Sequence, residues 1–430
     1  MINVNVIGAG LAGSEAAYQL ARRGFHVTLY EMRPTTTSPA HHTGWFAELV
    51  CSNSLRAADP TQAVGALKEE MRMMGSLIMQ AADLTRVPAG GALAVDREGF
   101  SKHITDTLTH HPTIDVVHRR VDAIPDGPTI VATGPLTDPA LADNLAKTLG
   151  TEKLYFFDAA APIIDASSID MSVCYRKSRY DKGGADYINC AMSKEEYDRF
   201  YHELIHAECT ELKDFELKLF EACMPVEEMA RRGKDTLLFG PLKPVGLGLE
   251  GREKPHAVVQ LRQDDVRATM YNMVGFQTHL KHSEQKRVFR LIPGLENARF
   301  LRHGVMHRNT YIHAPGVLDA TFRVKGHRPL YLAGQLTGVE GYVESAASGA
   351  LAGWNLAREL EGLKPITLPK TTMLGALADY IATAQGDFQP MHVNYGLVPE
   401  LGYKHKKKER KHFYSERAMA AMKDVIHRER

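Results

Sequence analysis

A strand–turn–helix–strand signature at the N-terminus constrains the fold of this chain most strongly. "INVNVIGAG" predicts a buried strand, "GLAGSEAAYQLARRG" a helix that ends at Gly24, and "FHVTLYE" a second strand. Gly8, Gly10 and Gly13 fall on GxGxxG spacing at the turn between strand and helix. A complete context of this kind predicts a Rossmann-like α/β domain that binds a dinucleotide.

Each position of this turn has a physical role in binding pyrophosphate. Gly8 permits the tight turn, Gly10 lets the backbone approach the phosphates, and Gly13 lets the helix pack against the strand. The helix N-terminus offers N–H groups and partial positive charge. Glu31, at the end of the second strand, is placed to bind ribose hydroxyls and would repel a 2′-phosphate, which argues against NADP in this site. The expected binding residues of the turn are Gly8, Ala9, Gly10, Leu11, Ala12 and Gly13.

Two later segments favour FAD over NAD as the cofactor. "GPTIVATGP" predicts a short strand that ends at Thr133 and Gly134. "RPLYLAGQLTGVEGYVESAASG" predicts a strand over 330–333, a glycine-rich loop, and a helix over about 343–361. A second loop and helix N-terminus give another place for phosphate or ribityl groups, as a long cofactor held at two sites requires. The residues expected there are Gly334, Gln335, Gly341, Tyr342 and Ser345.

The positions of these segments predict a nucleotide-binding domain that is split in the sequence. Its sheet begins at the N-terminus, is interrupted by an α+β domain, and is completed near residue 330. The predicted parts are the FAD-binding domain (1–149 and 300–400), the inserted substrate domain (150–299) and a basic tail (401–430). Within them, "EEMRMMGSLIMQAADL" predicts a core-facing helix. "GLGLEG" fits GxGxxG but lacks the strand and helix, so we expect a loop.

Composition excludes several classes of protein. The 430 residues are 44% hydrophobic and 24% charged, and no apolar run approaches the roughly twenty residues that cross a bilayer. "MINVNVIGAG" lacks the features of an export signal, so the cytoplasm is the expected compartment. The five cysteines are irregularly spaced without CxxC, so neither a disulfide framework nor a metal site is indicated. Each cysteine alone is more often a small buried hydrophobe than a catalyst.

The last thirty residues are strongly basic. Residues 401–430 hold ten Lys/Arg and four Asp/Glu, a net charge of +6, whereas the whole chain has +1. Such a segment, with Tyr403, Phe413 and Tyr414, is suited to gripping phosphates and stacking on bases. An ordinary solvated helix explains the same composition equally well.

With these motifs placed, the chain resembles the folate- and FAD-dependent tRNA (uracil-5-)-methyltransferases, the TrmFO family. The resemblance covers nearly the whole length. Its most discriminating motifs are "FAELVCSNSL", "FEACMPVEEMARRG" and "GVMHRNTYI", with support from "YEMRP", "LLFGPLKPVGL", "VVQLRQDD" and "FQPMHVNYGLVP".

The resemblance implies a reaction and a set of partners. It implies methylation of the uridine at position 54 in the tRNA T-loop. Methylenetetrahydrofolate would supply the carbon, and NADH or NADPH would supply reducing equivalents through FAD; no membrane is involved. It places catalytic roles on Cys51 and Cys223, and Arg33, in "YEMRP", joins the cofactor site. "HRNTY", just before the C-terminal flavin strand, is expected either to line the site between flavin and folate with Arg308 and Asn309 or to form a hydrogen-bonded turn.

The chemistry of uracil explains why thiols are needed. C5 is a poor nucleophile, so a thiolate first adds at C6 and makes C5 carbanion-like; C5 then attacks the methylene carbon. Our hypothesis is that Cys223, with Arg231 and Arg232 two turns on, adds to the ring. Cys51 would lie at the flavin edge as partner thiol or base, and the two roles are interchangeable at this level. Ser52, Asn53 and Ser54 after Cys51 are good N-cap residues.

Three alternatives share part of this pattern. The MnmG-type family, which modifies the wobble uridine, has the same glycine loop and "GYxE" helix start but is longer. A small-molecule flavin oxidoreductase needs neither the basic tail nor two isolated thiols. A flavin-bearing tRNA-binding protein with structural thiols is the third.

Overall fold

The predicted strand–turn–helix lies at the centre of a parallel sheet. This computed structural model describes residues 2–151, 153–210, 224–251 and 253–429. The strand order is β16 (Leu330–Leu332), β7 (Thr129–Val131), β1 (Asn3–Ile7), β2 (His26–Glu31) and β6 (Ile114–His118), with every pairing parallel. Because β16 follows the second sheet in the sequence but pairs with β7, the chain completes this sheet late, as predicted. The Rossmann-like fold class is confirmed.

Glycines allow helices from the N-terminal and C-terminal parts of the chain to pack closely together. α1 (Leu11–Ala21) packs against α10 (Tyr342–Leu360). A Cβ at Gly349 would lie 2.1 Å from the Ala12 carbonyl oxygen, and one at Gly353 would lie 2.8 Å from that of Ala16. The two helices therefore touch backbone to backbone, which larger residues would prevent. Other helices of this part are α2 (Ala63–Met73), α3 (Leu77–Leu84), α4 (Arg97–Thr109), α5 (Pro139–Leu149) and α11 (Met373–Thr383).

A second, antiparallel sheet has a hydrophobic core of its own. Its order is β10 (Tyr175–Arg176), β11 (Tyr187–Met192), β12 (Ala257–Gln263), β13 (Met270–Met273), β9 (Ile163–Asp165) and β14 (Phe300–Arg302). Helices α6 (Lys194–His206), α7 (Val226–Arg231), α8 (Thr236–Phe239) and α9 (His282–Phe289) accompany it. Phe200, Phe276 and Phe289 are fully buried in that core. The parallel sheet and this sheet therefore have separate cores.

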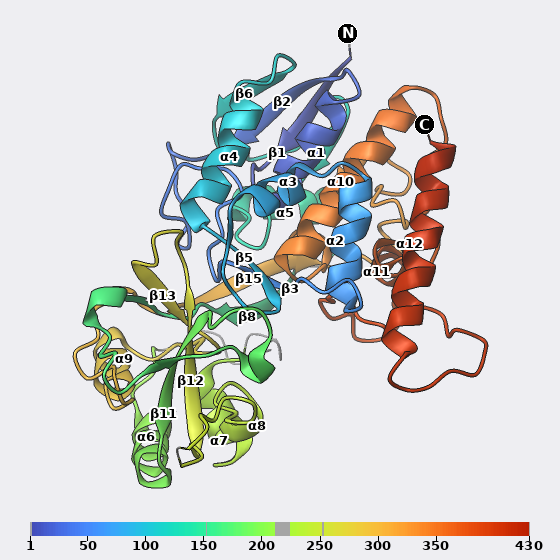
Figure 1. Ribbon diagram of the computed structural model, residues 1–430. Coiled ribbons are helices and arrows are strands. Elements are labelled where there is room, and N and C mark those ends of the chain that lie inside the picture. The colour runs from blue at the N-terminus through green and yellow to red at the C-terminus, as the bar shows by residue number, and fades with distance from the viewer. Residues whose placement is uncertain (1, 152, 211–223, 252, 430) are drawn as a thin grey trace.

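Two smaller ribbons lie between the sheets (Figure 1). One consists of β3 (Ser54–Ala57), β5 (Ala92–Val95) and β4 (Arg86–Val87), and the other of β8 (Lys153–Ala159) and β15 (Met306–Ile312). β3 begins three residues after Cys51, so the "CSNSL" loop lies where the two parts of the molecule meet.

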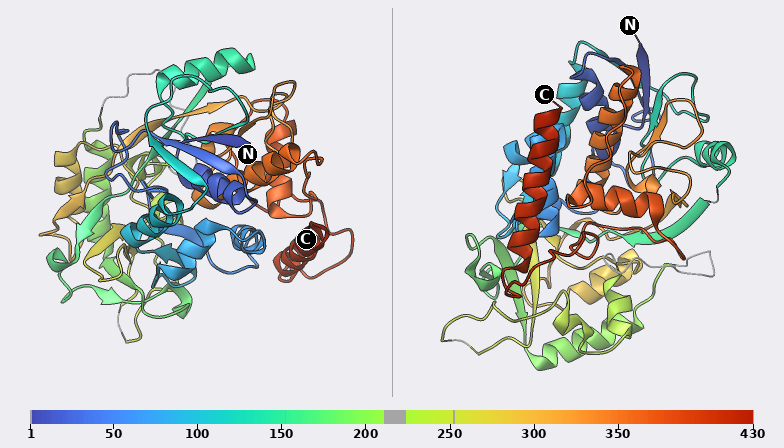
Figure 2. Two further views of the ribbon diagram at one scale, coloured as in Figure 1. Left: turned by 90° about the horizontal axis from the view of Figure 1, so that it is seen from above. Right: turned by 90° about the vertical axis from the view of Figure 1, so that its right-hand side faces the viewer.

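The basic tail ends in a long helix, α12 (Arg410–Arg428), which lies beside α2 on one flank of the molecule (Figure 2). Ser415 Oγ donates to the Pro60 carbonyl oxygen at 2.7 Å, and Tyr414 is buried and stacks on Tyr395. Base stacking by Tyr414 is therefore excluded, because its ring already has a partner in the core. The lysines just before the helix are exposed: Lys404, Lys406, Lys407 and Lys408.

The structure corrects one helix prediction and confirms one loop. "EEMRMMGSLIMQAADL" contributes to two helices, α2 and α3, because Gly75 takes a left-handed conformation (φ 70°) and Ser76 caps α3. The "GLGLEG" segment is a loop, as expected. The segment "LKDFELKLFEAC" lies outside the described residues. Among the residues that the structure describes, no helix combines the length and apolar character needed to span a bilayer.

Candidate active site at the carboxyl edge of the parallel sheet

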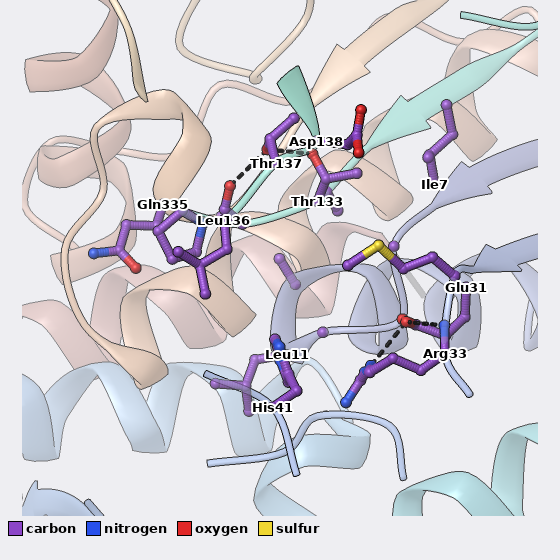
Figure 3. A pocket seen from close by; sticks show the side chains of 18 of the residues that line it. Ile7, Leu11, Glu31, Arg33, His41, Thr133, Leu136, Thr137, Asp138 and Gln335 are labelled. Atoms are coloured by element: carbon purple, nitrogen blue, oxygen red, sulfur yellow. Dashed lines mark hydrogen bonds and ion pairs between the residues drawn. The ribbon is translucent and has the colours of Figure 1, made fainter. Parts of the chain in front are cut away.

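A pocket opens where the parallel strands end (Figure 3). Its walls come from the connections after all five strands, β1, β2, β6, β7 and β16, and from the first turn of α10. β1 lies between β2 and β7, so the pocket sits at the point where the strand order reverses, the usual ligand position in open α/β sheets. The predicted residues that line it are Gly8, Gly10, Leu11, Ala12, Glu31, Arg33, Thr133, Gly134, Gly334, Gln335, Tyr342 and Ser345.

The three glycines of the turn divide their roles as the spacing predicts. A Cβ at Gly13 would lie 1.7 Å from the Gly8 carbonyl oxygen, so Gly13 brings α1 onto the strand end. Gly8 has φ 94°, and a Cβ there would meet the Ala132 carbonyl oxygen at 2.7 Å. A Cβ at Gly10 would have no heavy atom within 4 Å. Gly10 therefore keeps the pocket side of the turn open, as close approach of a diphosphate requires.

Glu31 is held rigidly at the rim of the pocket. Its Oε2 accepts from the Ala9 N–H at 2.9 Å, and its Oε1 accepts from Arg33 Nε at 2.8 Å and from the Arg33 N–H at 3.0 Å. Burial raises the pKa of Glu31, but the hydrogen bonds and charge of Arg33 outweigh it, so the pKa is lowered overall. The carboxylate is thus ionised and oriented, with Arg33 buried between Glu31 and Glu48.

The wall after β7 and the wall from α10 complete the pocket. Thr133 Oγ1 lies 2.7 Å from Thr137 Oγ1, and the Gly334 N–H donates to Ser348 Oγ at 2.8 Å. Both α1 and α10 begin at a glycine N-cap without a side-chain cap, and both first turns line the pocket. Two helix N-termini and one oriented carboxylate therefore face one pocket, which suits a long cofactor with a diphosphate and a ribose.

Tyr342 links this pocket to Cys51. Its ring lines the pocket, and its hydroxyl oxygen accepts from the Cys51 N–H at 2.7 Å and from the Ser52 N–H at 3.3 Å. The Cys51 thiol is partly exposed and donates to the Ala159 carbonyl oxygen at 3.6 Å. Cys51 therefore lies one residue away from the pocket wall, next to the start of α10.

Side chains from the second sheet hold the loop that carries Cys51. Arg262, on β12, donates from Nη2 to Ser52 Oγ at 2.6 Å and from Nε to Asn53 Oδ1 at 3.0 Å. Asn53 is fully buried, and its Nδ2 donates to the Gln263 and Val95 carbonyl oxygens, both at 2.9 Å. We call Ser52, Asn53 and Arg262 the junction clamp, because they connect the Cys51 loop to the antiparallel sheet.

Buried arginines make the surroundings of Cys51 electropositive. Arg97 forms an ion pair with Asp264 at 2.9 Å and donates to the Leu49 carbonyl oxygen. Burial lowers the pKa of Arg97, but the carboxylate of Asp264 raises it above the usual value, so the guanidinium stays charged. Both Arg97 and Arg262 interact electrostatically with Cys51. Cations close to a thiol favour a negative charge on its sulfur.

The remaining predicted site residues that the structure describes do not line the pocket wall. Ala9 contributes its N–H to Glu31, and Gly341 serves packing, since a Cβ there would lie 2.5 Å from Glu344 Oε2. Asn309 is buried in β15 and is not part of the pocket wall; Arg308 belongs to the same strand. Cys223 lies outside the described residues.

The prediction that Ser52, Asn53 and Ser54 cap a helix is wrong. The residues that follow them form β3, and Ser52 Oγ accepts from the Ser54 N–H at 3.1 Å within the loop. Small polar side chains satisfy backbone groups in loops as readily as at helix ends. Arg97, Arg262 and Asp264 were not predicted as site residues, although "VVQLRQDD" contains two of them.

Comparisons with known proteins agree with this geometry. The family model described as "Glucose inhibited division protein A" matches residues 3–364. The methylenetetrahydrofolate--tRNA-(uracil-5-)-methyltransferase TrmFO of Exiguobacterium sibiricum is 59% identical over 430 residues, which cover 99% of each chain. The protein of the same name from Listeria innocua is 59% identical, with 98% of each chain covered.

A solved structure shows the same fold at low sequence identity. Aquifex aeolicus GidA superposes with a TM-score of 0.72 at 17% identity, covering 99% of this chain and 75% of that one. That likeness concerns the fold alone, whereas the relatives above match along the whole length. The chain therefore belongs to the TrmFO family of methylenetetrahydrofolate–tRNA-(uracil-5-)-methyltransferases.

Proposed function

We propose that this protein methylates C5 of the T-loop uridine, position 54, in tRNA, with methylenetetrahydrofolate as carbon donor and NADH or NADPH as reductant. One observation carries the proposal: Tyr342 lines the dinucleotide pocket and also binds the backbone of Cys51, so a thiol lies beside the cofactor site. The bound FAD supplies the redox step that converts a methylene into a methyl group.

The residues of the pocket bind and orient the cofactor. Gly8 and Gly10 with the N-terminus of α1 hold the diphosphate, and ionised Glu31 accepts hydrogen bonds from ribose hydroxyls. The first turn of α10, with Tyr342 and Ser345, closes the opposite wall. With the cofactor bound in this way, Cys51 would lie beside the Tyr342 end of the pocket.

The arginines around Cys51 favour its thiolate form, which a partner thiol or base requires. Arg97 and Arg262 stabilise negative charge there, and the junction clamp fixes the loop against rotation. Cys223 is the thiol proposed to add to C6 of uracil; this assignment rests on its motif. The chemistry needs one thiolate on the pyrimidine ring and a second group to manage the C5 proton.

The basic tail is the proposed contact for the T-arm. Four exposed lysines precede α12, and Lys411 Nζ donates to Gln62 Oε1 at 2.9 Å, on the loop after β3. The tail therefore meets the same chain segment that leads away from Cys51. Phosphate contacts of this kind offset the cost of turning a base out of a folded tRNA, about a few kcal/mol.

Methyl transfer to an unmodified tRNA transcript tests the proposal. The purified flavoprotein is incubated with the transcript, methylenetetrahydrofolate labelled in its methylene carbon, and NADH. Label in 5-methyluridine at position 54 supports the proposal. NADH consumption without labelled tRNA would instead indicate a small-molecule oxidoreductase, and label at the wobble position would indicate MnmG-type chemistry.

Adduct mapping with 5-fluorouridine tRNA then separates the two thiols. The fluorine blocks loss of the C5 substituent, so the thiol that adds to C6 stays bonded to the ring. We expect the adduct to survive in Cys51→Ala and to disappear in Cys223→Ala. The reverse result would exchange the two assignments.

A further inference from the structure

A cluster of a thiol, an imidazole and a carboxylate lies in the second domain, outside the site described above. Cys209 follows α6, Glu227 is in the first turn of α7, and His279 precedes α9. One ligand atom from each of the three lies within 4.8 Å of the other two. Glu227 and His279 are buried, and Cys209 is partly exposed, which leaves one side open to solvent. The spacing of the cysteines gave no sign of this site because its members come from three separate segments.

The histidine of this cluster has an unusual environment. His279 Nδ1 is buried and lies 2.7 Å from Glu227 Oε1, close enough for an ion pair, and the imidazole also interacts with Cys209. Without a metal, this contact pairs a buried imidazolium with the carboxylate; a bound cation would replace the proton on the imidazole.

The surroundings match those of a metal ligand set. Glu227 accepts from Thr278 Oγ1 at 2.8 Å and from the His279 N–H at 2.7 Å, so its position is fixed. The other ring nitrogen, His279 Nε2, faces Glu228 Oε1 at 3.7 Å. Metal-binding histidines generally direct their second nitrogen at a carboxylate, and ligating carboxylates are themselves hydrogen-bonded.

We propose that Cys209, Glu227 and His279 bind a thiophilic divalent cation, with Zn²⁺ as the best match. Thiolate sulfur, imidazole nitrogen and carboxylate oxygen are the three donor types that zinc takes in proteins, and three protein ligands leave a fourth position for water. The net charge of the cluster also suits a divalent cation. A Cys209 thiolate, Glu227 and Glu228 carry three negative charges, and Arg231, whose Nη2 lies 3.5 Å from Cys209 Sγ, carries one positive charge. The sum is two negative charges, which a divalent cation neutralises. The bound ion ties together the ends of α6, α7 and α9.

Calorimetric titration of the full-length flavoprotein with zinc chloride tests this site. The protein is first dialysed against EDTA, and the titration is made at pH 8, because bound ligands must be deprotonated. We expect one tightly bound zinc ion per chain. Cys209→Ser and His279→Gln should each weaken its binding by at least about 100-fold, since even outer-shell changes at zinc sites cost 10- to 100-fold.

Two matched variants identify the site. His206→Gln removes an exposed histidine whose ring lies 4.4 Å from that of His202, one helical turn away; the two could bind zinc adventitiously. Cys174→Ser removes a buried thiol of the same domain. Both should bind zinc as the wild type does. Absence of a tightly bound zinc ion, loss of it in His206→Gln, or wild-type affinity in Cys209→Ser would each overturn the proposal. Cys209→Ser decides the matter if His279→Gln fails to fold, which circular dichroism and flavin content report.

Discussion

The dinucleotide pocket and the Cys51 loop are adjacent but are built in different ways. The pocket is made of backbone: glycines, strand ends and two helix N-termini, with Glu31 held by main-chain N–H groups. The Cys51 loop is held by side chains that reach across from other segments, chiefly Arg262 and Tyr342. A site built from backbone, such as the pocket, tolerates the exchange of side chains around it but not a larger side chain in place of its glycines. A site held by side chains, such as the Cys51 loop, depends on individual hydrogen-bonding groups.

Removing the Cys51 sulfur should abolish methyl transfer without affecting FAD binding in the dinucleotide pocket. Cys51→Ala is expected to lower single-turnover methyl transfer by at least about 10⁴-fold, as loss of a reacting thiol does, while FAD stays bound. The measurements are label incorporation into tRNA and flavin absorbance after gel filtration. Cys174→Ala, in the buried core of the second domain, is the control and should keep the wild-type rate. A Cys51→Ala enzyme with a tenth of normal activity would remove Cys51 from the mechanism.

A pair of glycine variants tests how the pocket is built. Gly13→Ala places a Cβ 1.7 Å from the Gly8 carbonyl oxygen, so the unfolding free energy of the apoprotein should fall by about 3 kcal/mol. Gly10→Ala adds a methyl group to open space at φ −72°, so stability should change by less than about 1 kcal/mol. FAD affinity should nevertheless fall at least about tenfold, because that methyl meets the diphosphate. Denaturant unfolding and flavin titration measure the two effects, and equal destabilisation by both variants would contradict this division of roles.

The junction clamp should show a smaller effect, on rate alone. Arg262→Lys keeps the charge but loses the pair of bonds to Ser52 Oγ and Asn53 Oδ1. Misplacement of the Cys51 loop by about 1 Å should lower kcat about 10- to 100-fold with FAD affinity unchanged. Arg299→Lys, at an exposed ion pair with Asp165, is the matched control. A change in flavin binding in Arg262→Lys would mean that the two regions are not independent.

Substitutions in the basic tail should have the smallest effect of the four, and the effect should appear in the KM for tRNA. Replacing Lys406, Lys407 and Lys408 together by Gln should raise KM about tenfold at moderate salt and leave kcat unchanged. The slope of log KM against log salt concentration should become shallower by about 2, since each phosphate contact contributes about 0.7–0.9. Exposed lysines on other elements (Lys102, Lys147 and Lys364), changed to Gln together, remove the same charge and should have little effect. Equal effects of both triple variants would show that net charge alone attracts tRNA.

The contrast between backbone-built and side-chain-held regions also explains which features could be predicted from the sequence. The GxGxxG turn, the late strand and the α10 start were predicted because local spacing and backbone conformation define them. Cys174 and Cys190 are buried in the second core, as expected of isolated cysteines. The clamp was missed because Arg262 and Asn53 meet only after folding, and nothing in their own segments specifies the partner. Asn309 was placed in the cofactor site by motif; the structure buries it in β15, outside the pocket wall. The domain boundaries and the roles of Cys51 and Cys223 stay predictions.

The late position of β16 and α10 in the chain sets an order of events during biosynthesis. The first glycine turn emerges from the ribosome early, but its opposite wall, from Gly334 to Ser345, follows the whole antiparallel sheet. A nascent chain therefore has half a flavin site, with the face of α1 that later meets α10 still bare. Cofactor capture must therefore wait until Gly334–Ser345 have been synthesised, so products truncated before them should stay colourless.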